Sequence, residues 1–208
     1  MDLLNTFVVL LIVIDPIAVV WLFAVITRDY PAKEQRHMAN LGVFLSAIIL
    51  AVFYFAGEAL FKILGISIPA FRIAGGILLF LLAMDMVFAR HSGLRSTTQS
   101  ERIEAETKHD ISVFPLAFPL IAGPGAITTV LLMASSAQNL WAFWGMFGVL
   151  LLVLLLTLGT LWLAPSLTRW LGETGSNVVS RMLGIILCAL AAQYVLDGIK
   201  ASFTAGVD

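Results

Sequence analysis

Two short motifs place helix-breaking residues inside otherwise apolar segments. Asp15-Pro16 interrupts the apolar run 3–26, and Gly123-Pro124-Gly125 interrupts a later one. Aspartate is a good helix N-cap, proline is favoured at the first position of a helix, and a proline further inside removes a backbone donor. Each motif therefore predicts a break followed by a second half-helix, which covers residues 16–26 in the first case.

The start of a half-helix carries unpaired backbone N–H groups and a partial positive charge. Inside a membrane, such groups persist only within protein or beside a polar cavity. Two breaks that meet near the midplane would suit the carboxylate of a small substrate, and the hydroxyls of Thr128 and Thr129, one turn after the second break, would add donors. The predicted substrate-binding residues are Asp15, Pro16, Ile17, Gly123, Pro124, Gly125, Ala126, Thr128 and Thr129.

Asp15 is the only acidic residue near the predicted midplane. An ionisable residue inside a membrane span is a candidate functional residue by default. Its carboxylate could pair with a substrate ammonium group, carry a coupling proton, or serve only as the cap of its half-helix. The sequence leaves these three roles open.

Two arginines, Arg72 and Arg181, stand at the start of two other apolar segments. One interpretation is that each side chain snorkels to the membrane interface, where a long cation costs little. The other is that each is a gate residue that pairs with an acidic partner on its side of the membrane.

No motif points to an enzyme, a cofactor or a metal. The chain lacks the H-E-x-x-H, G-x-S-x-G and P-loop patterns. His37, His91 and His109 do not have the mutual spacing of metal ligands, and a single cysteine, Cys188, excludes a Cys-rich metal site. We therefore expect no catalytic residue, no metal site and no cofactor.

The composition is that of a membrane protein. Of the 208 residues, 60% are hydrophobic and only 12% are charged. Soluble domains carry about 25% charged and 45–50% apolar residues, so a soluble globule of this size could not bury so much apolar surface. The net charge of -1 gives no reason to expect a nucleic-acid partner.

Six segments are long and apolar enough to cross a bilayer as a helix, which takes roughly 20 residues. Two of them share the stretch 111–168, which contains no Asp, Glu, Lys or Arg, and the polar string 135–139 predicts the turn between them. The other four predicted spans cover residues 3–26, 41–61, 70–89 and 182–199.

Basic residues indicate how these spans are oriented. Most of the Lys and Arg residues lie in three connections, residues 28–40, 90–110 and 165–181. The positive-inside rule places these three loops in the cytoplasm and both chain termini on the opposite, periplasmic side.

The two halves of the chain resemble each other. The motifs Asp15-Pro16 and Gly123-Pro124 are 108 positions apart, and Arg72 and Arg181 open the third and sixth spans at an offset of 109. A chance match between apolar segments is the alternative explanation. The regular offset predicts an internal duplication.

The duplication divides the chain into two repeats of three spans. The first covers residues 1–90, the second covers residues 111–208, and residues 91–110 form a cytoplasmic connector. Because each repeat has an odd number of spans, the second must be inverted relative to the first. We therefore predict an all-α membrane protein of six transmembrane helices, with helices one and four broken, on a plan that is typical of secondary transporters.

Several strings of the sequence also resemble one known family. They are Asp15-Pro16, the run Ala74–Phe80, the more specific run Pro115–Ile127 (PLAFPLIAGPGAI) and the run Leu196–Ile199. Together they are similar to the MarC family of six-span bacterial inner-membrane proteins, also described as the neutral amino acid transporter family. The resemblance covers about residues 3–203. It departs from the family at Ile17-Ala18-Val19, where members often carry a glycine and an asparagine.

The resemblance implies transport of small neutral amino acids, such as glycine or alanine, across the bacterial inner membrane. We expect a secondary transporter with a neutral amino acid as substrate, membrane lipid as its surroundings, and coupling to protons or sodium. Two alternatives stay open: an exporter of other small solutes or ions on the same fold, and a non-transporting membrane assembly protein. The mass of 22.6 kDa is compatible with a homodimer, although no sequence feature demands one.

Overall fold

The computed structural model describes residues 2–88 and 111–204, and all regular structure within them is helical. The predicted connector 91–110 lies outside the described residues. The helices are α1 (Leu3–Ile14), α2 (Pro16–Ile26), α3 (Ala32–Leu64), α4 (Ile68–Phe88), η1 (Ser112–Ile121), α6 (Pro124–Ser136), α7 (Leu140–Trp162) and α8 (Ala164–Thr204).

The helices have the length and apolar character of membrane spans. Within the described residues, five helical segments qualify, with α1 and α2 together counted as one segment of 24 residues. η1 and α6 make a sixth if they are taken as one span that is bent by 57°. The prediction of an all-α membrane protein with breaks in the first and fourth spans is therefore confirmed, and the described residues supply five or six of the six predicted spans.

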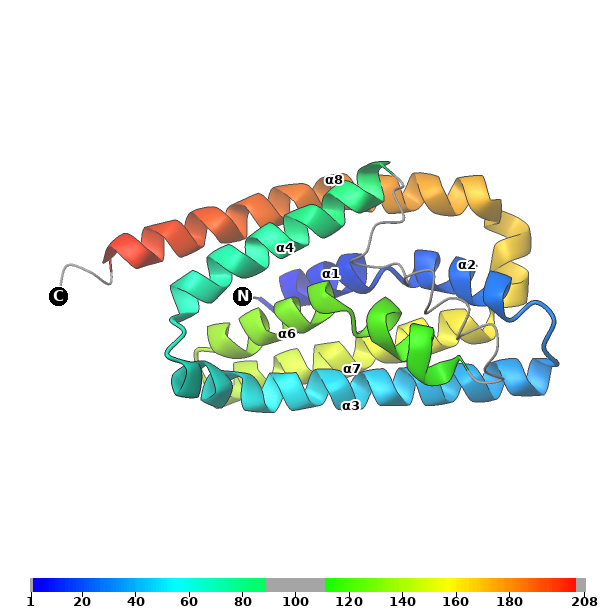
Figure 1. The fold of residues 1–208 in the computed structure, drawn as a ribbon, viewed down its shortest axis with the longest axis horizontal. Coiled ribbons are helices and arrows are strands. Elements are labelled where there is room, and N and C mark those ends of the chain that lie inside the picture. Colours follow the sequence, from blue (N-terminus) through cyan, green and yellow to red (C-terminus); the bar gives the residue numbers. More distant parts are fainter. Residues whose placement is uncertain (1, 89–110, 205–208) are drawn as a thin grey trace.

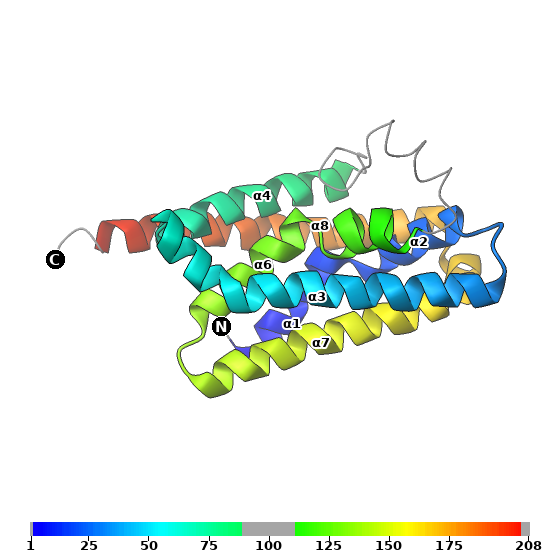
Figure 2. The ribbon, with the colours of Figure 1, turned by 60° about the horizontal axis from the view of Figure 1, so that its bottom comes forward.

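The broken spans lie in the middle of the bundle. α4 packs along α8 on one side, α3 packs on α7 on the other, and α1, α2, η1 and α6 lie between these two pairs (Figures 1 and 2). α2 contacts α8 and α7, while α6 contacts α4 and α3. The breaks are thereby surrounded by protein rather than by lipid, which is the only place where irregular backbone is tolerated at membrane depth.

Corresponding helices of the two halves run in opposite directions. Figure 1 shows α1 and α2 running against η1 and α6, α3 against α7, and α4 against α8. This is the arrangement that an inverted repeat predicts, although the internal duplication itself stays a prediction. The start of α1 and the end of α8 lie at one end of the bundle, and the α2–α3 and α7–α8 connections lie at the other.

The outer faces of the bundle carry large apolar side chains. Trp141 and Phe203, for example, expose 88% and 76% of their surface. Such a continuous apolar exterior is unfavourable in water, but it is the ordinary state of a helix that faces lipid.

Two predicted loops are in fact mainly helical. α3 begins at Ala32 instead of Leu41, so only a short turn of the predicted loop 28–40 remains. α8 begins at Ala164, so residues 165–181 are helical too, with one kink at Gly172. The predictions of loops there were wrong because hydropathy detects only the apolar part of a helix. A helix continues through polar residues, since its backbone hydrogen bonds are internal.

The kink in α8 depends on a glycine. Gly172 has φ 62° and ψ 179°, a conformation that strains any residue with a side chain. A Cβ at this position would meet nothing within 4 Å, so the constraint comes from the backbone and not from packing.

Two hydrogen bonds join α3 to α7, one near each end of the pair. The hydroxyl of Tyr54 donates to the carbonyl oxygen of Phe143 over 2.6 Å, inside a cluster of aromatic rings. The indole Nε1 of Trp162 donates to Oδ1 of Asn40 over 2.9 Å. We name these two contacts the α3–α7 clasps, because together they fix the length and register over which the two helices pack.

Glycines let α4 and α8 approach closely. A Cβ at Gly76 would lie 2.9 Å from the carbonyl oxygen of Ala191, and a Cβ at Gly198 would lie 3.0 Å from that of Pro69. Small residues at such positions allow backbones to pack in a membrane, where no hydrophobic effect drives helices together.

Candidate functional site at two helix breaks

The first break is a single residue. α1 ends at Ile14 and α2 begins at Pro16, while Asp15 between them has φ 50° and ψ 68°. Within the described residues, Asp15 is the only non-glycine residue with positive φ. Asparagine and aspartate tolerate this left-handed conformation better than other side chains do. The chain is thus bent at the position that the sequence predicted.

The Asp15 side chain caps the second half-helix. Its Oδ1 accepts a hydrogen bond of 3.3 Å from the backbone N–H of Ala18, and its own carbonyl oxygen accepts from the N–H of Val19 over 3.1 Å. Because Pro16 has no N–H, the first turn of α2 has few donors left for any other partner. The predicted capping role of Asp15 is confirmed, and Asp15 is completely buried.

Asp15 is also joined to the last span. The hydroxyl of Ser180, on α8, donates to Oδ2 of Asp15 over 2.9 Å. Ser180 was not among the predicted site residues, since a serine 165 positions away carries no local signal of pairing with an aspartate.

The second break is longer and has no side-chain cap. η1 ends at Ile121, α6 begins at Pro124, and Gly123 precedes it in an extended conformation (φ -72°, ψ 174°) without any side-chain hydrogen bond to the helix start. A Cβ at Gly123 would overlap the carbonyl oxygen of Pro119, so a glycine is required there. The start of α6 at Pro124 agrees with the predicted second half-helix.

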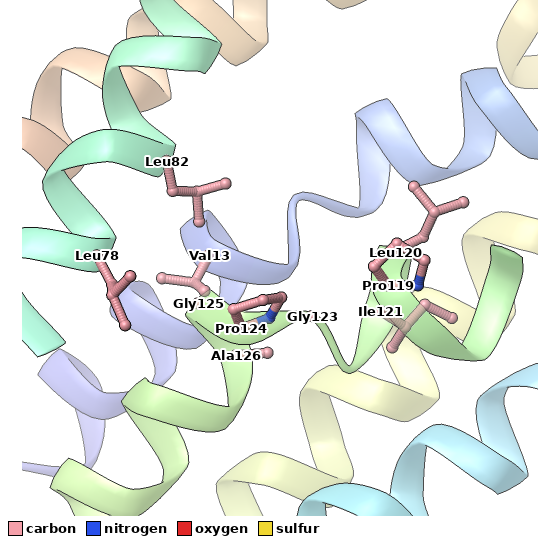
Figure 3. Close-up of a pocket in the computed structure, with 10 residues that line it drawn as sticks. All are labelled: Val13, Leu78, Leu82, Pro119, Leu120, Ile121, Gly123, Pro124, Gly125 and Ala126. Atoms are coloured by element: carbon pink, nitrogen blue, oxygen red, sulfur yellow. The ribbon is translucent and has the colours of Figure 1, made fainter. Parts of the chain in front are cut away.

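The two breaks lie side by side in the core. A Cβ at Gly125 would lie 3.4 Å from Cγ1 of Val13, which is two residues before Asp15. Figure 3 shows Val13 beside the start of α6, with Leu78 and Leu82 reaching in from α4.

A small cavity lies at this junction. Its volume is about 10 Å³, which is room for about one water molecule. It is lined by residues of α1, α4, η1 and α6: Val13, Leu78, Leu82, Pro119, Leu120, Ile121, Gly123, Pro124, Gly125 and Ala126.

The structure brings only some of the predicted site residues to this cavity. Those of the second break, residues 123–126, form one wall. Asp15 and Pro16 are buried beside it without lining it. Ile17 lines a different cavity of about 20 Å³, between α2, α7 and the kink of α8.

The two predicted threonines point elsewhere in this conformation. The hydroxyl of Thr129 donates to the carbonyl oxygen of Gly125 over 2.9 Å, a bond within α6 that uses its only proton. The methyl group of Thr128 faces Gly75 on α4. Neither lines the cavity.

The two predicted gate residues lie toward opposite ends of the α4–α8 pair. Arg72 is partly buried near the start of α4, in the neighbourhood of Tyr194 of α8. Arg181 is exposed on α8, next to Ser180. Neither lines the cavity, and their role as gates stays a prediction.

No metal centre is formed by the residues that the structure describes: these ranges contain no group of three or more His, Cys, Asp or Glu side chains placed to hold an ion. Of the three histidines, His91 and His109 lie outside the described residues.

Comparison with known proteins decides the family. A family model described as "MarC family integral membrane protein" matches residues 2–203. The chain belongs to the MarC family. The resemblance drawn from the two breaks and the run 115–127 is thereby confirmed.

Relatives in the MarC family cover almost the whole chain. The chain is 36% identical over 198 residues to the UPF0056 membrane protein YhcE of Escherichia coli, covering 95% of this chain and 91% of that protein. It is 34% identical over 201 residues to the UPF0056 membrane protein YvbG of Bacillus subtilis, with 97% and 95% covered. A UPF0056 membrane protein of Aquifex aeolicus is 34% identical over 197 residues, with 94% and 91% covered.

The names of these MarC family relatives state a membrane protein and no substrate. No solved structure matches the chain.

Proposed function

We propose that this MarC family protein is a secondary transporter of small neutral amino acids, not an enzyme. The observation that carries the proposal is the uncapped half-helix start at Gly123, which lies in the core of a membrane-spanning bundle and faces a cavity. A half-helix start with free donors at membrane depth is typical of substrate sites in transporters.

The donors at the second break are backbone N–H groups. Helix geometry leaves the first N–H groups of α6 without intrahelical partners, and Pro124 has none to offer. The N–H groups of Gly125 and Ala126 remain, on residues that line the cavity. The small side chains of both let an anion approach the backbone closely.

Asp15 supports the idea that the bound group is a carboxylate. At the first break, the Asp15 carboxylate accepts from the N–H of Ala18 and so caps α2. Gly123 occupies the matching place at the second break, at the offset of 108, but has no side chain. In the proposed site, the carboxylate of the substrate supplies the cap that the second half-helix lacks.

The walls of the cavity support a small, neutral substrate. The surrounding side chains of Val13, Leu78 and Leu82 are apolar, so they suit a side chain such as hydrogen or methyl. Asp15 is the nearby carboxylate, and we assign to it either the substrate ammonium group or a coupling proton. Because the cavity holds about one water molecule, we interpret the structure as a closed conformation, and binding requires opening of the bundle.

The opening we propose is a rocking motion between the two halves, as in other transporters built on inverted repeats. We place the protein in the bacterial inner membrane with both termini in the periplasm, as the distribution of basic residues predicts. Neutral amino acids and membrane lipid are its proposed partners.

Uptake of labelled glycine and alanine into proteoliposomes tests the proposal. Uptake is measured with no gradient, with a pH gradient and with a sodium gradient, and folding is checked by gel filtration. Accumulation that follows one gradient supports the proposal and identifies the coupling ion. No uptake under any gradient by folded protein would remove the amino acid assignment and favour the export of other small solutes or ions.

A further inference from the structure

Thr6 on α1 has a buried hydroxyl with no hydrogen-bond partner. Its exposed fraction is 0%, and its Oγ1 is the one buried side-chain polar atom left without a partner within residues 2–88 and 111–204. A helical threonine usually donates to the carbonyl four residues earlier, as Thr27 and Thr157 do. An unsatisfied buried hydroxyl is unfavourable, so its presence in this core needs an explanation.

The hydroxyl lies between the outside of the bundle and the cavity. The residues before Thr6, from Asp2 to Asn5, are exposed, so Thr6 is the first buried side chain of α1. Val13 follows seven residues later, which places both on the same face of the helix about 10 Å apart. Since Val13 lines the cavity at the two breaks, Thr6 lies on the face of α1 that leads to it.

α6 adds further hydroxyls at the same end of the bundle. The end of α6 and the start of α1 lie at that end (Figure 1). The hydroxyls of Ser135 and Ser136 both donate to the carbonyl oxygen of Leu132, over 3.0 and 2.6 Å. Their oxygens keep lone pairs that can accept from another group.

We propose that the Thr6 hydroxyl is a polar contact on the path between this end of the bundle and the cavity at the helix breaks. The inference rests on the proposed transport function, and it names a solute-contacting residue outside the breaks. A zwitterion that leaves water needs groups that replace its hydrogen bonds along the way. In the closed conformation the path is shut and the Thr6 hydroxyl has no hydrogen-bond partner. In the open conformation, water or the solute becomes its partner.

Transport by two variants of Thr6 tests the contact. Thr6→Val keeps the shape of the side chain without its hydroxyl, and Thr6→Ser keeps the hydroxyl. Glycine or alanine uptake is expected to fall about tenfold in Thr6→Val, the effect of a lost hydrogen bond, and to stay within about twofold in Thr6→Ser. The matched control is Thr157→Val, at a completely buried threonine of α7 whose hydroxyl bonds within its own helix.

The thermal stability of Thr6→Val distinguishes a role of Thr6 in the path from a role in folding. Since the Thr6 hydroxyl has no partner to lose, the thermal unfolding midpoint of Thr6→Val is expected to equal or exceed that of the native protein. Slow transport with an unchanged or higher midpoint supports the proposal. Native uptake rates in Thr6→Val overturn it.

Thiol labelling decides the point without any transport assay. Thr6→Cys and Thr157→Cys are placed in a Cys188→Ala background, which removes the only native cysteine. In proteoliposomes, a small charged methanethiosulfonate reagent is expected to modify the cysteine at position 6 at least tenfold faster than the one at position 157. Equal, slow reaction at both positions overturns the path.

The two measurements keep the two proposals apart. If the native protein takes up no amino acid, the proposed function fails, and labelling at position 6 still shows whether the path exists. If uptake proceeds but position 6 is unreactive and Thr6→Val is fully active, the function stands and the role of Thr6 is rejected.

Discussion

The hydroxyl of Ser180 on α8 donates a hydrogen bond of 2.9 Å to Oδ2 of Asp15, at the break between α1 and α2. The other carboxylate oxygen, Oδ1, accepts from the backbone N–H of Ala18. The buried side chain of Asp15 thus caps the start of α2 and also links it to α8, so a shift of α8 must act on the first break.

Removing this tie should loosen the bundle. In Ser180→Ala, the buried carboxyl group of Asp15 loses one hydrogen bond, which we expect to lower the free energy of unfolding by about 1–3 kcal/mol. The measurement is the unfolding midpoint in detergent. Ser202→Ala is the matched control, because the hydroxyl of Ser202 bonds to Gly198 within α8. Equal midpoints in both variants would contradict a role for Ser180 in holding the break.

Substitutions of Asp15 should separate its cap from its charge. Asparagine can still accept from Ala18 and tolerates positive φ, whereas alanine can do neither, so Asp15→Ala is expected to be less stable than Asp15→Asn by about 1–2 kcal/mol. If Asp15 also pairs with the substrate or carries a proton, Asp15→Asn folds but loses at least tenfold in uptake. Unchanged affinity and pH dependence in that variant would leave Asp15 with the cap alone.

Filling the cavity should stop transport without unfolding the protein. A Cβ at Gly125 would lie only 2.5 Å from Cδ2 of Leu82, so Gly125→Leu would push a side chain into the space that the substrate needs. We expect uptake to become undetectable. Gly148→Leu, at a helical glycine with open space around it, is the control and should transport normally. Normal uptake by Gly125→Leu would show that the solute passes elsewhere.

Alanine at the kink of α8 should change the stability of the protein in the opposite direction from alanine at an ordinary helical glycine. Gly172→Ala forces a side chain into positive φ and is expected to cost about 1 kcal/mol of stability. Gly159→Ala, in α7, is expected to stabilise by up to about 1 kcal/mol, since alanine favours the helix. Neither added Cβ meets a neighbour, so backbone conformation alone decides whether each substitution stabilises or destabilises the protein. Comparison of the unfolding midpoints of the two variants checks this prediction, and a stabilised Gly172→Ala would show that α8 is straight.

The breaks themselves were predictable from sequence, because capping chemistry is local. Asp15 as a cap, Pro16 as the first residue of α2 and Pro124 as the first residue of α6 follow from residue types alone. The starts of α3 and α8 were not predictable from sequence, because their first turns are polar and a hydropathy pattern detects only apolar segments.

Contacts between distant segments could not be read from the sequence. Ser180 beside Asp15, and Leu78 and Leu82 at the cavity, depend on how α8 and α4 are rotated about their axes. The orphan hydroxyl of Thr6 is likewise visible only once its neighbours are known. The sequence therefore indicated where the backbone bends, and the packing decided which side chains meet there.

The membrane-spanning helices differ in length, and this couples the protein to the lipid around it. α3 has 33 residues, whose first turns are polar, whereas α4 has 21. These lengths correspond to about 50 and 31 Å of helix, against a hydrocarbon core of about 30 Å. α3 is therefore too long to stand upright within the hydrocarbon core, so it tilts or carries its polar first turns into the water. The α3–α7 clasps pass any such tilt on to α7. The chain length of the lipid thus acts on the packing of the bundle in the same way as a substitution on α3 would.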